Sequence, residues 1–443
     1  MTMLSTVRSV WWIYGFDYIF AVMLAFYSRL HPYPGTNLMD VDQLEPEYDF
    51  IIIGAGSAGS ILANRLSEEV SWRVLVLEAG DHETPLSEVP GLSHRLRDTS
   101  MDWQYRTAPP HGNQSYCLAM NDLSCKWPRG RVVGGSSVLN SLLYVRGNRR
   151  DYDRWARMGN VGWGFDDVLK YFLKSEDNAN PDLVDTEYHA AGGYLSVQDL
   201  PYVSPVADSI IEAAKSRGYE NLDINGRNQT GFTIAQVNLR NGKRCSVTKA
   251  FIIPAANRPN LHISQNSFVT KLNFDSQRRA KSVTFTKNGV THTIKSKKEI
   301  ILSAGSIGSP QILMLSGIGP RKHLKQLNIQ VVKNLRVGYN LQDHVGTIVT
   351  YRTDAAVTLK PADILNERIA FEYFTHGDGP LTSPGGFEIL GFINTEHADS
   401  SGSYPDVPLI LGHRVCSTVM KNPSARNSTT SAPTFLSTLG TRT

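Results

Sequence analysis

The apolar pattern along the chain predicts strands that alternate with helices. Residues 50–53, Phe-Ile-Ile-Ile, form a short unbroken apolar run, which is typical of a parallel strand buried on both faces. Residues 60–66 continue as a helix, and residues 73–77 give a second apolar strand. A strand, a helix and a second strand in this order form the unit of a parallel sheet, so we predict an α/β fold.

Later segments extend this pattern. Residues 165–175 and 206–217 have the spacing of amphipathic helices, and Gly218 follows the second where a C-terminal glycine cap belongs. A small antiparallel sheet is predicted from four alternating segments: residues 261–264, 269–274, 282–286 and 291–294. Residues 299–303 return to a buried strand, and a helix follows from Gly308. We expect this strand to join the opening sheet, so the domain that contains the sheet is discontinuous in sequence.

The turn after the first strand carries glycines in G-x-G-x-x-G spacing, at Gly54, Gly56 and Gly59. The first allows a tight turn, the second lets backbone approach a pyrophosphate, and the third lets the helix pack closely on the strand. The helix N-terminus supplies N–H groups and a positive dipole end for phosphates. Glu78 ends the second strand, where an acid accepts hydrogen bonds from ribose hydroxyls. These features together predict a dinucleotide site.

A second glycine-rich stretch, Gly-Gly-Ser-Ser at residues 134–137, follows a Trp-Pro-Arg-Gly run at residues 127–130. Its bare backbone amides and two hydroxyls suit a phosphate or a flat ring pressed against the main chain. The same composition fits a turn followed by an N-cap serine. The residues alone leave both interpretations open.

Composition is that of a folded protein without a nucleic-acid partner. The chain has 443 residues, of which 41% are hydrophobic and 19% charged. This length suggests about two or three domains. The net charge of +4 is slight for such a chain, and no basic block with interleaved aromatic residues occurs. We therefore expect no nucleic-acid binding, and no metal site is predicted.

The N-terminus is unusually apolar. Residues 10–30 are mostly apolar and aromatic, with Arg8 before them and Asp17 among them. A signal peptide needs a basic start, an apolar centre and small residues near the cleavage point. A membrane span needs about twenty apolar residues, and a charge at its centre costs about 2.5–3.5 kcal/mol. We favour a signal peptide, with a signal anchor and a buried or disordered extension as alternatives. Residues 32–47 predict a linker.

Cysteines and glycosylation triplets point to the secretory route. Four cysteines are too few for a disulfide scaffold, but Cys117 and Cys125 lie close together in a loop-like stretch and could form a disulfide in an oxidising compartment. Asn-x-Ser/Thr triplets begin at Asn113, Asn228 and Asn427. Together with the apolar N-terminus, they favour a secreted, extracellular glycoprotein. A membrane-anchored protein is the alternative if the N-terminal segment stays uncleaved.

Residues 130–155 resemble the first signature of the glucose–methanol–choline (GMC) family of FAD-dependent oxidoreductases. Residues 305–319 resemble its second signature, and both follow the glycine motif in the expected order. Paired cysteines before a Trp-Pro-Arg-Gly run, here Cys117 and Cys125, are similar to those of insect glucose dehydrogenase-like members. The resemblance extends from about residue 48 to about residue 411.

The resemblance implies FAD as cofactor and the oxidation of a CH–OH group of an alcohol or sugar, with hydride transfer to flavin N5. A quinone or another electron acceptor is implied as the partner. The fold implied is a discontinuous FAD-binding Rossmann-like domain with a second, incomplete α+β substrate domain. The bounds are 1–47 for a signal peptide or anchor plus linker, 48–150 and 245–345 for the FAD-binding domain, 151–244 and 346–412 for the substrate domain, and 413–443 for a divergent tail.

The implied cofactor-binding residues come from both glycine-rich stretches, the end of the second strand and three later segments. They are Gly54, Ala55, Gly56, Ser57, Ala58, Gly59, Glu78, Val133, Gly135, Ser136, Asn140, Val269, Ala304, Gly305, Asp343 and His344. Val269 lies where the family holds the adenine through backbone atoms. Without the resemblance, we would predict Val269 as a core valine, and Asp343 with His344 as a turn and a surface pair.

No catalytic residue is assigned. Alcohol oxidation needs a base for the hydroxyl proton, and histidine suits this role because its unperturbed pKa, about 6.5, lies near working pH. The family's catalytic histidine and its partner belong to a segment without a counterpart here, so we expect this pair beyond the C-terminus. His376, His397 and His413 lie outside the family's motif. A chain that binds FAD without this base would be slowed by about 10²–10⁴-fold. A non-catalytic FAD-binding or misfolded truncation is therefore the alternative function.

Overall fold

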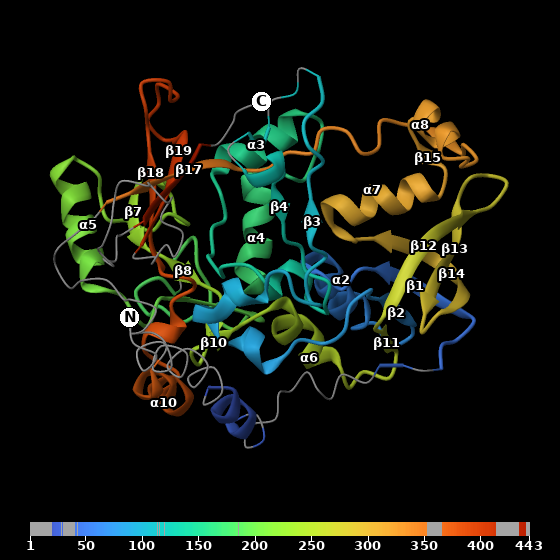
Figure 1. Ribbon diagram of the computed structural model, residues 1–443, viewed down its shortest axis with the longest axis horizontal. Coiled ribbons are helices and arrows are strands. Elements are labelled where there is room, and N and C mark those ends of the chain that lie inside the picture. Colours follow the sequence, from blue (N-terminus) through green and yellow to red (C-terminus); the bar gives the residue numbers. More distant parts are fainter. Residues whose placement is uncertain are drawn as a thin grey trace, which may run out of the picture.

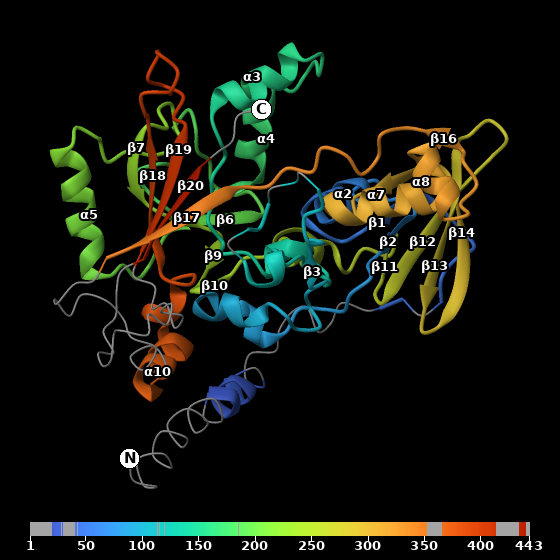
Figure 2. The ribbon, with the colours of Figure 1, turned by 45° about the horizontal axis from the view of Figure 1, so that its top comes forward.

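The computed structural model describes residues 20–27, 29, 40–41, 43–112, 114, 116–118, 120–184, 186–351, 366–412 and 434–439. In this part of the chain, the two larger sheets lie in opposite halves of the molecule, with helices packed around each (Figures 1 and 2). The fold is α/β, as predicted. The domain bounds themselves stay a prediction.

The larger sheet has six strands among the described residues, in the order β11-β2-β1-β14-β13-β12. Its strands are β1 (Glu47–Ile53), β2 (Val74–Leu77), β11 (Leu261–Ser264), β12 (Ser267–Phe274), β13 (Ala280–Lys287) and β14 (Val290–Leu302). β1 pairs in parallel with β2 on one side and with β14 on the other. This pairing confirms that the strand at residues 299–303 joins the opening sheet.

The separate antiparallel sheet predicted from residues 261–294 does not exist. β11 pairs in parallel with β2, on the far side of the large sheet. β12 and β13 are antiparallel, but they extend the same sheet through β14, which is one strand of 13 residues that contacts β13 first and β1 afterwards. The prediction failed because alternation marks a strand without saying which strand lies beside it.

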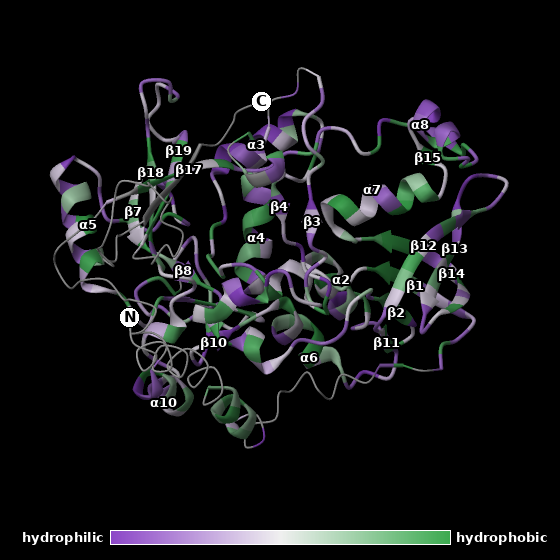
Figure 3. Ribbon diagram, in the orientation of Figure 1, coloured by the Kyte–Doolittle hydropathy of each residue, from purple (hydrophilic) through white to green (hydrophobic). Residues whose placement is uncertain are grey.

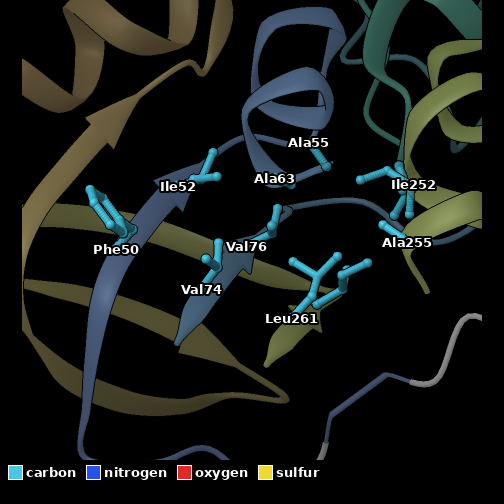
Figure 4. Close-up of a cluster of buried hydrophobic side chains, with 11 residues drawn as sticks. Phe50, Ile52, Ala55, Ala63, Val74, Val76, Ile252, Ala255 and Leu261 are labelled. Atoms are coloured by element: carbon cyan, nitrogen blue, oxygen red, sulfur yellow. The ribbon is translucent and has the colours of Figure 1, made fainter. Parts of the chain in front are cut away.

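Both faces of the central strands β1 and β2 of the large sheet are buried. Phe50 and Ile52 of β1 belong to a cluster on one face, where α2 (Ser57–Leu66), η6 (Thr248–Ile252) and α6 (Ile253–Ala255) pack (Figure 4). Ile51 and Ile53 belong to the cluster on the other face, where α7 (Gly305–Leu315) packs. The central strands therefore appear mostly green, the colour of hydrophobic residues, in Figure 3. An unbroken apolar run forms this strand because neither face meets water.

The second sheet is antiparallel throughout. Its order is β17-β20-β19-β18-β7, with β17 (Val345–Thr350), β20 (Thr434–Leu439), β19 (Val407–Gly412), β18 (Phe387–Ile393) and β7 (Gly231–Ile234). Helix α5 (Pro205–Ser216) packs on it, since Ala207, Ile211 and Ala214 share a cluster with Phe232 and Ile389. Helix α4 (Phe165–Ser175) has the predicted bounds, and α5 matches its prediction to within one residue.

Short elements connect these parts. The strands are β3 (Tyr105–Arg106), β4 (Lys126–Trp127), β5 (Glu176–Asn178), β6 (Leu195–Asp199), β8 (Gln236–Val237), β9 (Leu239–Arg240), β10 (Lys243–Arg244), β15 (Ile318–Gly319) and β16 (Lys333–Asn334). The helices are α3 (Arg149–Arg157), α8 (Arg321–Gln326) and α10 (Glu367–His376). The 3₁₀ turns are η2 (Pro85–Glu88), η3 (Pro90–Leu96), η4 (Asn121–Leu123), η5 (Gly135–Val138) and η7 (Pro380–Thr382).

Most of the apolar N-terminal segment lies outside the described residues, as do Cys416, His413, Asn113 and Asn427. Its residues 20–27 are helical and pack on α10, where the rings of Phe20 and Phe374 lie 5.5 Å apart. Within the described ranges, no helix reaches the length and hydropathy that a membrane crossing needs. The choice among signal peptide, anchor and extension stays a prediction.

Candidate functional site

A cavity of about 590 Å³ lies at the carboxyl ends of β1, β2 and β14. Doubly wound sheets bind their ligands in the crevice at this edge. Both glycine-rich loops and the start of α7 form its walls. The predicted site residues that line it are Gly54, Gly56, Ser57, Ala58, Glu78, Gly135, Ser136, Val269, Ala304 and Gly305.

The first loop requires glycine for reasons that the contacts show. Gly54 has a φ of +93°, and a methyl carbon on it would lie 2.7 Å from the carbonyl oxygen of Ser303. A methyl carbon on Gly59 would lie 2.0 Å from the carbonyl oxygen of Gly54, so α2 packs against the turn itself. Gly56 is the N-cap of α2 and makes no side-chain cap hydrogen bond. The amides of the first turn are therefore available to a phosphate at the cavity wall.

The second loop lies directly against the first. Gly135 has a φ of +55°, and a methyl carbon on it would lie 2.7 Å from the Cα of Gly56. η5 begins after Gly134, which is its N-cap and makes no side-chain cap hydrogen bond. The alternative of an N-cap serine is therefore wrong. Instead, the Ser137 hydroxyl donates to the Gly134 carbonyl at 2.7 Å, which closes the loop on itself.

Glu78 is the buried charge of the cavity. Its Oε2 accepts the N–H of Ala55 at 2.9 Å, and its Oε1 accepts the N–H of Gly80 at 2.9 Å. Burial raises the pKa of Glu78 to about 7, although these N–H donors and the nearby Arg131 favour the ionised form. The carboxyl group is thus held by backbone on both oxygens, with lone pairs left for hydroxyl donors in the cavity.

Several predicted site residues lie behind or away from the cavity lining. Ala55 and Gly59 are buried within the first loop, and the Val133 carbonyl accepts the hydroxyl of Thr248 at 2.8 Å. The Oδ1 atom of Asn140 accepts a hydrogen bond from Nη1 of Arg244 at 2.9 Å. Asp343 and His344 are exposed and do not line the cavity. Asp343 accepts the His344 N–H at 2.8 Å, an arrangement that fits the turn weighed as their alternative.

The sequence reasoning missed an aromatic wall. Trp103 and Tyr105 line the cavity with their rings 5.7 Å apart and nearly parallel, at 4°. Phe268 completes this wall with 39% of its surface exposed, although it is adjacent to the buried Val269. Such flat apolar faces suit a purine base. The only signal in sequence was Trp-x-Tyr inside a segment otherwise rich in turn formers.

The profile of the GMC oxidoreductase family matches residues 48–346, a range that holds the cavity and every residue of its lining. The chain belongs to this GMC oxidoreductase family. The match contains both glycine-rich loops and all of the six-stranded sheet except Glu47 at the start of β1. The resemblance inferred from the two signatures is therefore confirmed.

Curated relatives of the chain include dehydrogenases from an insect and a bacterium. It is 44% identical over 377 residues to the glucose dehydrogenase (FAD, quinone) of Drosophila melanogaster, covering 83% of this chain and 58% of the relative. It is 35% identical to the alcohol dehydrogenase (acceptor) of Pseudomonas putida, covering 82% of this chain and 63% of the relative. The chain thus spans roughly three-fifths of the length of these relatives.

Solved structures share the fold. Pyridoxine 4-oxidase from Mesorbium loti has a TM-score of 0.74 at 29% identity, covering 88% of this chain and 71% of the other. A formate oxidase has a TM-score of 0.75 at 25% identity, covering 90% of this chain and 73% of the other. Both of these solved proteins are named oxidases, and the shared fold covers most of this chain.

A second cavity, of about 510 Å³, lies between α3 and the antiparallel sheet. Its lining combines apolar residues of β18 and β19 with polar and charged ones, among them Leu390, Phe392, Asp151, Arg154 and His344. Apolar walls with a small number of polar groups are the usual character of a small-molecule pocket. The chain therefore has a second cavity of a size that suits a small molecule, outside the 590 Å³ cavity.

Proposed function

We propose that this GMC oxidoreductase binds FAD in the 590 Å³ cavity and oxidises the CH–OH group of an alcohol or a sugar. The observation that carries the proposal is the contact of Gly135 with Gly56, which places two glycine loops and the buried Glu78 around one cavity. The Drosophila relative, a glucose dehydrogenase whose name includes FAD and quinone, supports this cofactor and a quinone-type acceptor.

The lining residues fit the parts of FAD. The open N-terminus of α2 would hold the pyrophosphate, and Glu78 would accept the ribose hydroxyls. Val269 and the aromatic wall of Trp103, Tyr105 and Phe268 would hold the adenine. Gly135 and Ser136 would face the flat flavin ring, since a loop without side-chain bulk admits it. Ala304 and Gly305 would lie beside the dinucleotide.

Bound FAD supplies a hydride acceptor for the oxidation of the substrate carbon. The contribution of this chain is to bind and orient. Its glycine loops would bring backbone amides to the cofactor, and the second cavity would take the substrate between its apolar and polar lining residues. We propose the sequence-derived bounds, 48–150 with 245–345 and 151–244 with 346–412, for the FAD-binding and substrate domains.

A non-catalytic FAD-binding protein is the second candidate. Among the described residues, no histidine lines the 590 Å³ cavity. His344 is exposed at the second cavity, and His376 and His397 are exposed elsewhere. Of the described histidines, only His344 therefore lines either cavity, and it is not in the proposed FAD cavity where the flavin would accept the hydride.

We further propose that the protein is a secreted glycoprotein. A disulfide joins Cys117 to Cys125, with Cα atoms 5.5 Å apart, and such bonds persist in oxidising compartments. Asn228 is exposed, and the hydroxyl of Thr230 in its triplet donates to the Gly402 carbonyl at 2.9 Å. Secretion from insect cells should yield a protein whose mass falls on removal of N-glycans. Asn228→Gln should remove one glycan, and an unchanged mass would contradict modification at this residue.

The visible absorption spectrum tests the function. The purified protein should show a flavin spectrum, and anaerobic glucose or another alcohol should bleach it. A flavin spectrum that persists through a panel of sugars and alcohols would favour the non-catalytic candidate. Bound NAD without flavin after gentle purification would contradict the FAD assignment. Release of the cofactor by heat, followed by chromatography, distinguishes FAD from FMN.

A further inference from the structure

Arg244 is a fully buried cation directly behind the second glycine loop. Its side chain is among the largest with less than 2% of its surface exposed. Its Nη1 donates to the Ser137 carbonyl and to Asn140 Oδ1, and its Nη2 donates to the Asn140 carbonyl, all at 2.9 Å. Its Nε donates to the Ser87 carbonyl at 2.9 Å. One guanidinium therefore holds η5 and η2 together.

The residues after Arg244 contact the same loop. The N–H of Val247 donates to the Ser137 hydroxyl at 3.1 Å, and the Thr248 hydroxyl donates to the Val133 carbonyl at 2.8 Å. The segment 244–248 thus hydrogen-bonds the chain both before and after the glycines of the second loop. The Gly134 N–H donates to the Ala55 carbonyl of the first loop at 2.8 Å, so the second loop is held by the first loop in front and by the 244–248 segment behind.

Electrostatics keep the guanidinium charged in this position. Burial lowers the pKa of Arg244 to about 10, while the charge of Glu83 favours the protonated form. Glu83 is also buried, and one of its oxygens accepts the Ser246 hydroxyl. A buried cation is tolerated where several carbonyl oxygens and a nearby carboxylate replace its hydration. At neutral pH, Arg244 therefore carries its charge.

We propose that Arg244 is a positioning residue that holds the Gly134–Asn140 loop against the Gly54–Gly59 loop in the geometry that binds FAD. The inference rests on the proposed FAD function. The planar fork of arginine donates to carbonyls in fixed directions, which the single ammonium group of lysine does not reproduce. Arg244 touches no residue of the cavity lining through these bonds; it acts through the loop that carries Gly135 and Ser136.

Arg146 offers a matched control. It is also a buried arginine, with 1% of its side chain exposed, and it donates to Glu176 at 2.8 Å and to the Tyr144 hydroxyl at 3.0 Å. None of these residues lines the FAD cavity. Arg146→Met removes a buried cation of the same kind elsewhere in the fold. It therefore reports the loss of global stability without a change at the loop.

The experiment compares wild type, Arg244→Met, Arg244→Lys and Arg146→Met. For each full-length protein, the FAD dissociation constant is measured by flavin fluorescence, and unfolding of the cofactor-free form by circular dichroism. We expect Arg244→Met to weaken FAD binding by about tenfold to hundredfold, and Arg244→Lys by less, because misplaced binding groups cost affinity of this order. Arg146→Met should lower the unfolding temperature and leave the FAD dissociation constant unchanged.

Provided that the wild-type protein binds FAD, either of two outcomes would overturn the inference. One is an unchanged FAD dissociation constant in the Arg244 variants. The other is a loss of FAD affinity in Arg146→Met equal to that in Arg244→Met, which would show that lower stability alone explains the weaker binding. If Arg244→Met does not fold, the FAD dissociation constant of Arg244→Lys tests the inference instead, because lysine keeps the buried charge. Absence of FAD from the wild-type protein itself would instead contradict the proposed function.

Discussion

Gly56 and Gly135 make an asymmetric backbone contact. A methyl carbon on Gly135 would lie 2.7 Å from the Cα of Gly56, whereas one on Gly56 would lie 4.0 Å from the Cα of Gly135. Of these two glycines, only Gly135 therefore has no room for a side chain. The separation of the two loops, and with it the shape of the cavity, is therefore set at Gly135.

Gly135→Ala should prevent the close approach of the two glycine loops. The methyl group forces the loops apart, and the φ of +55° adds strain, so we expect FAD affinity to fall by about tenfold to hundredfold. Gly56→Ala should cost less. Gly289→Ala is the matched control, because Gly289 has a φ of +76° and open space around it. Equal FAD affinity in wild type and Gly135→Ala, measured by fluorescence titration, would show that the loops do not form one site.

Glu78→Gln tests the buried carboxylate. The amide turns an N–H group towards a backbone donor, so FAD affinity should fall by about tenfold or more. The pKa of Glu78 is raised to about 7, so its ionised, accepting form grows as pH rises through this value. Wild-type FAD affinity should therefore increase between pH 6 and 8, and that of Glu78→Gln should not. Identical pH profiles for the two proteins would exclude Glu78 as the titrating group.

The environment of His189 indicates that the folded protein loses stability at alkaline pH. Its side chain, 1% exposed, lies 3.0 Å from Glu176 and 2.9 Å from Asp223. Burial alone lowers the pKa of His189, but the hydrogen bonds and charges of Asp223 and Glu176 outweigh burial and raise it to about 9. The ordinary pKa is about 6.5, so this stabilisation is complete below pH 6.5 and lost as pH rises to 9.

The loss is on the order of 3 kcal/mol, from the shift in pKa. Denaturant unfolding of wild type between pH 6 and 9.5 measures it. His189→Gln should be less stable at pH 6 and show a flatter profile. A wild-type profile that stays level across this window, or one that His189→Gln reproduces, would contradict the assignment.

Removal of the disulfide should destabilise the β3–β4 region. Cys117 and Cys125 close a short loop between strands that pair Tyr105 with Trp127. The Cys117→Ser, Cys125→Ser double variant should lose about 2–3 kcal/mol of unfolding free energy, because the unfolded chain gains freedom. Thermal unfolding with and without reductant measures the loss. Reductant should lower the wild-type transition and leave the double variant unchanged; equal responses would contradict this role.

Features that depend on the spacing of neighbouring residues could be predicted from the sequence alone. The amphipathic helix at residues 165–175 was predicted with its bounds, and the first strand and helix were predicted in the right order, although they begin three residues earlier, at Glu47 and Ser57. Periodicity and glycine spacing are properties of neighbouring residues, so they can be recognised without knowledge of the fold. The family signatures extended this to the choice of cofactor, because they are also local.

Only the tertiary structure decided which distant segments meet. β11 reads as an ordinary strand, yet its partner is β2. Arg244 reads as an ordinary charged residue, yet it hydrogen-bonds Ser137, 107 residues earlier. The aromatic wall and the contact of Gly135 with Gly56 arise in the same way. Two distant segments pair because together they bury their apolar surface and satisfy their hydrogen bonds in the folded chain. The local pattern of one segment does not say which other segment will be its partner.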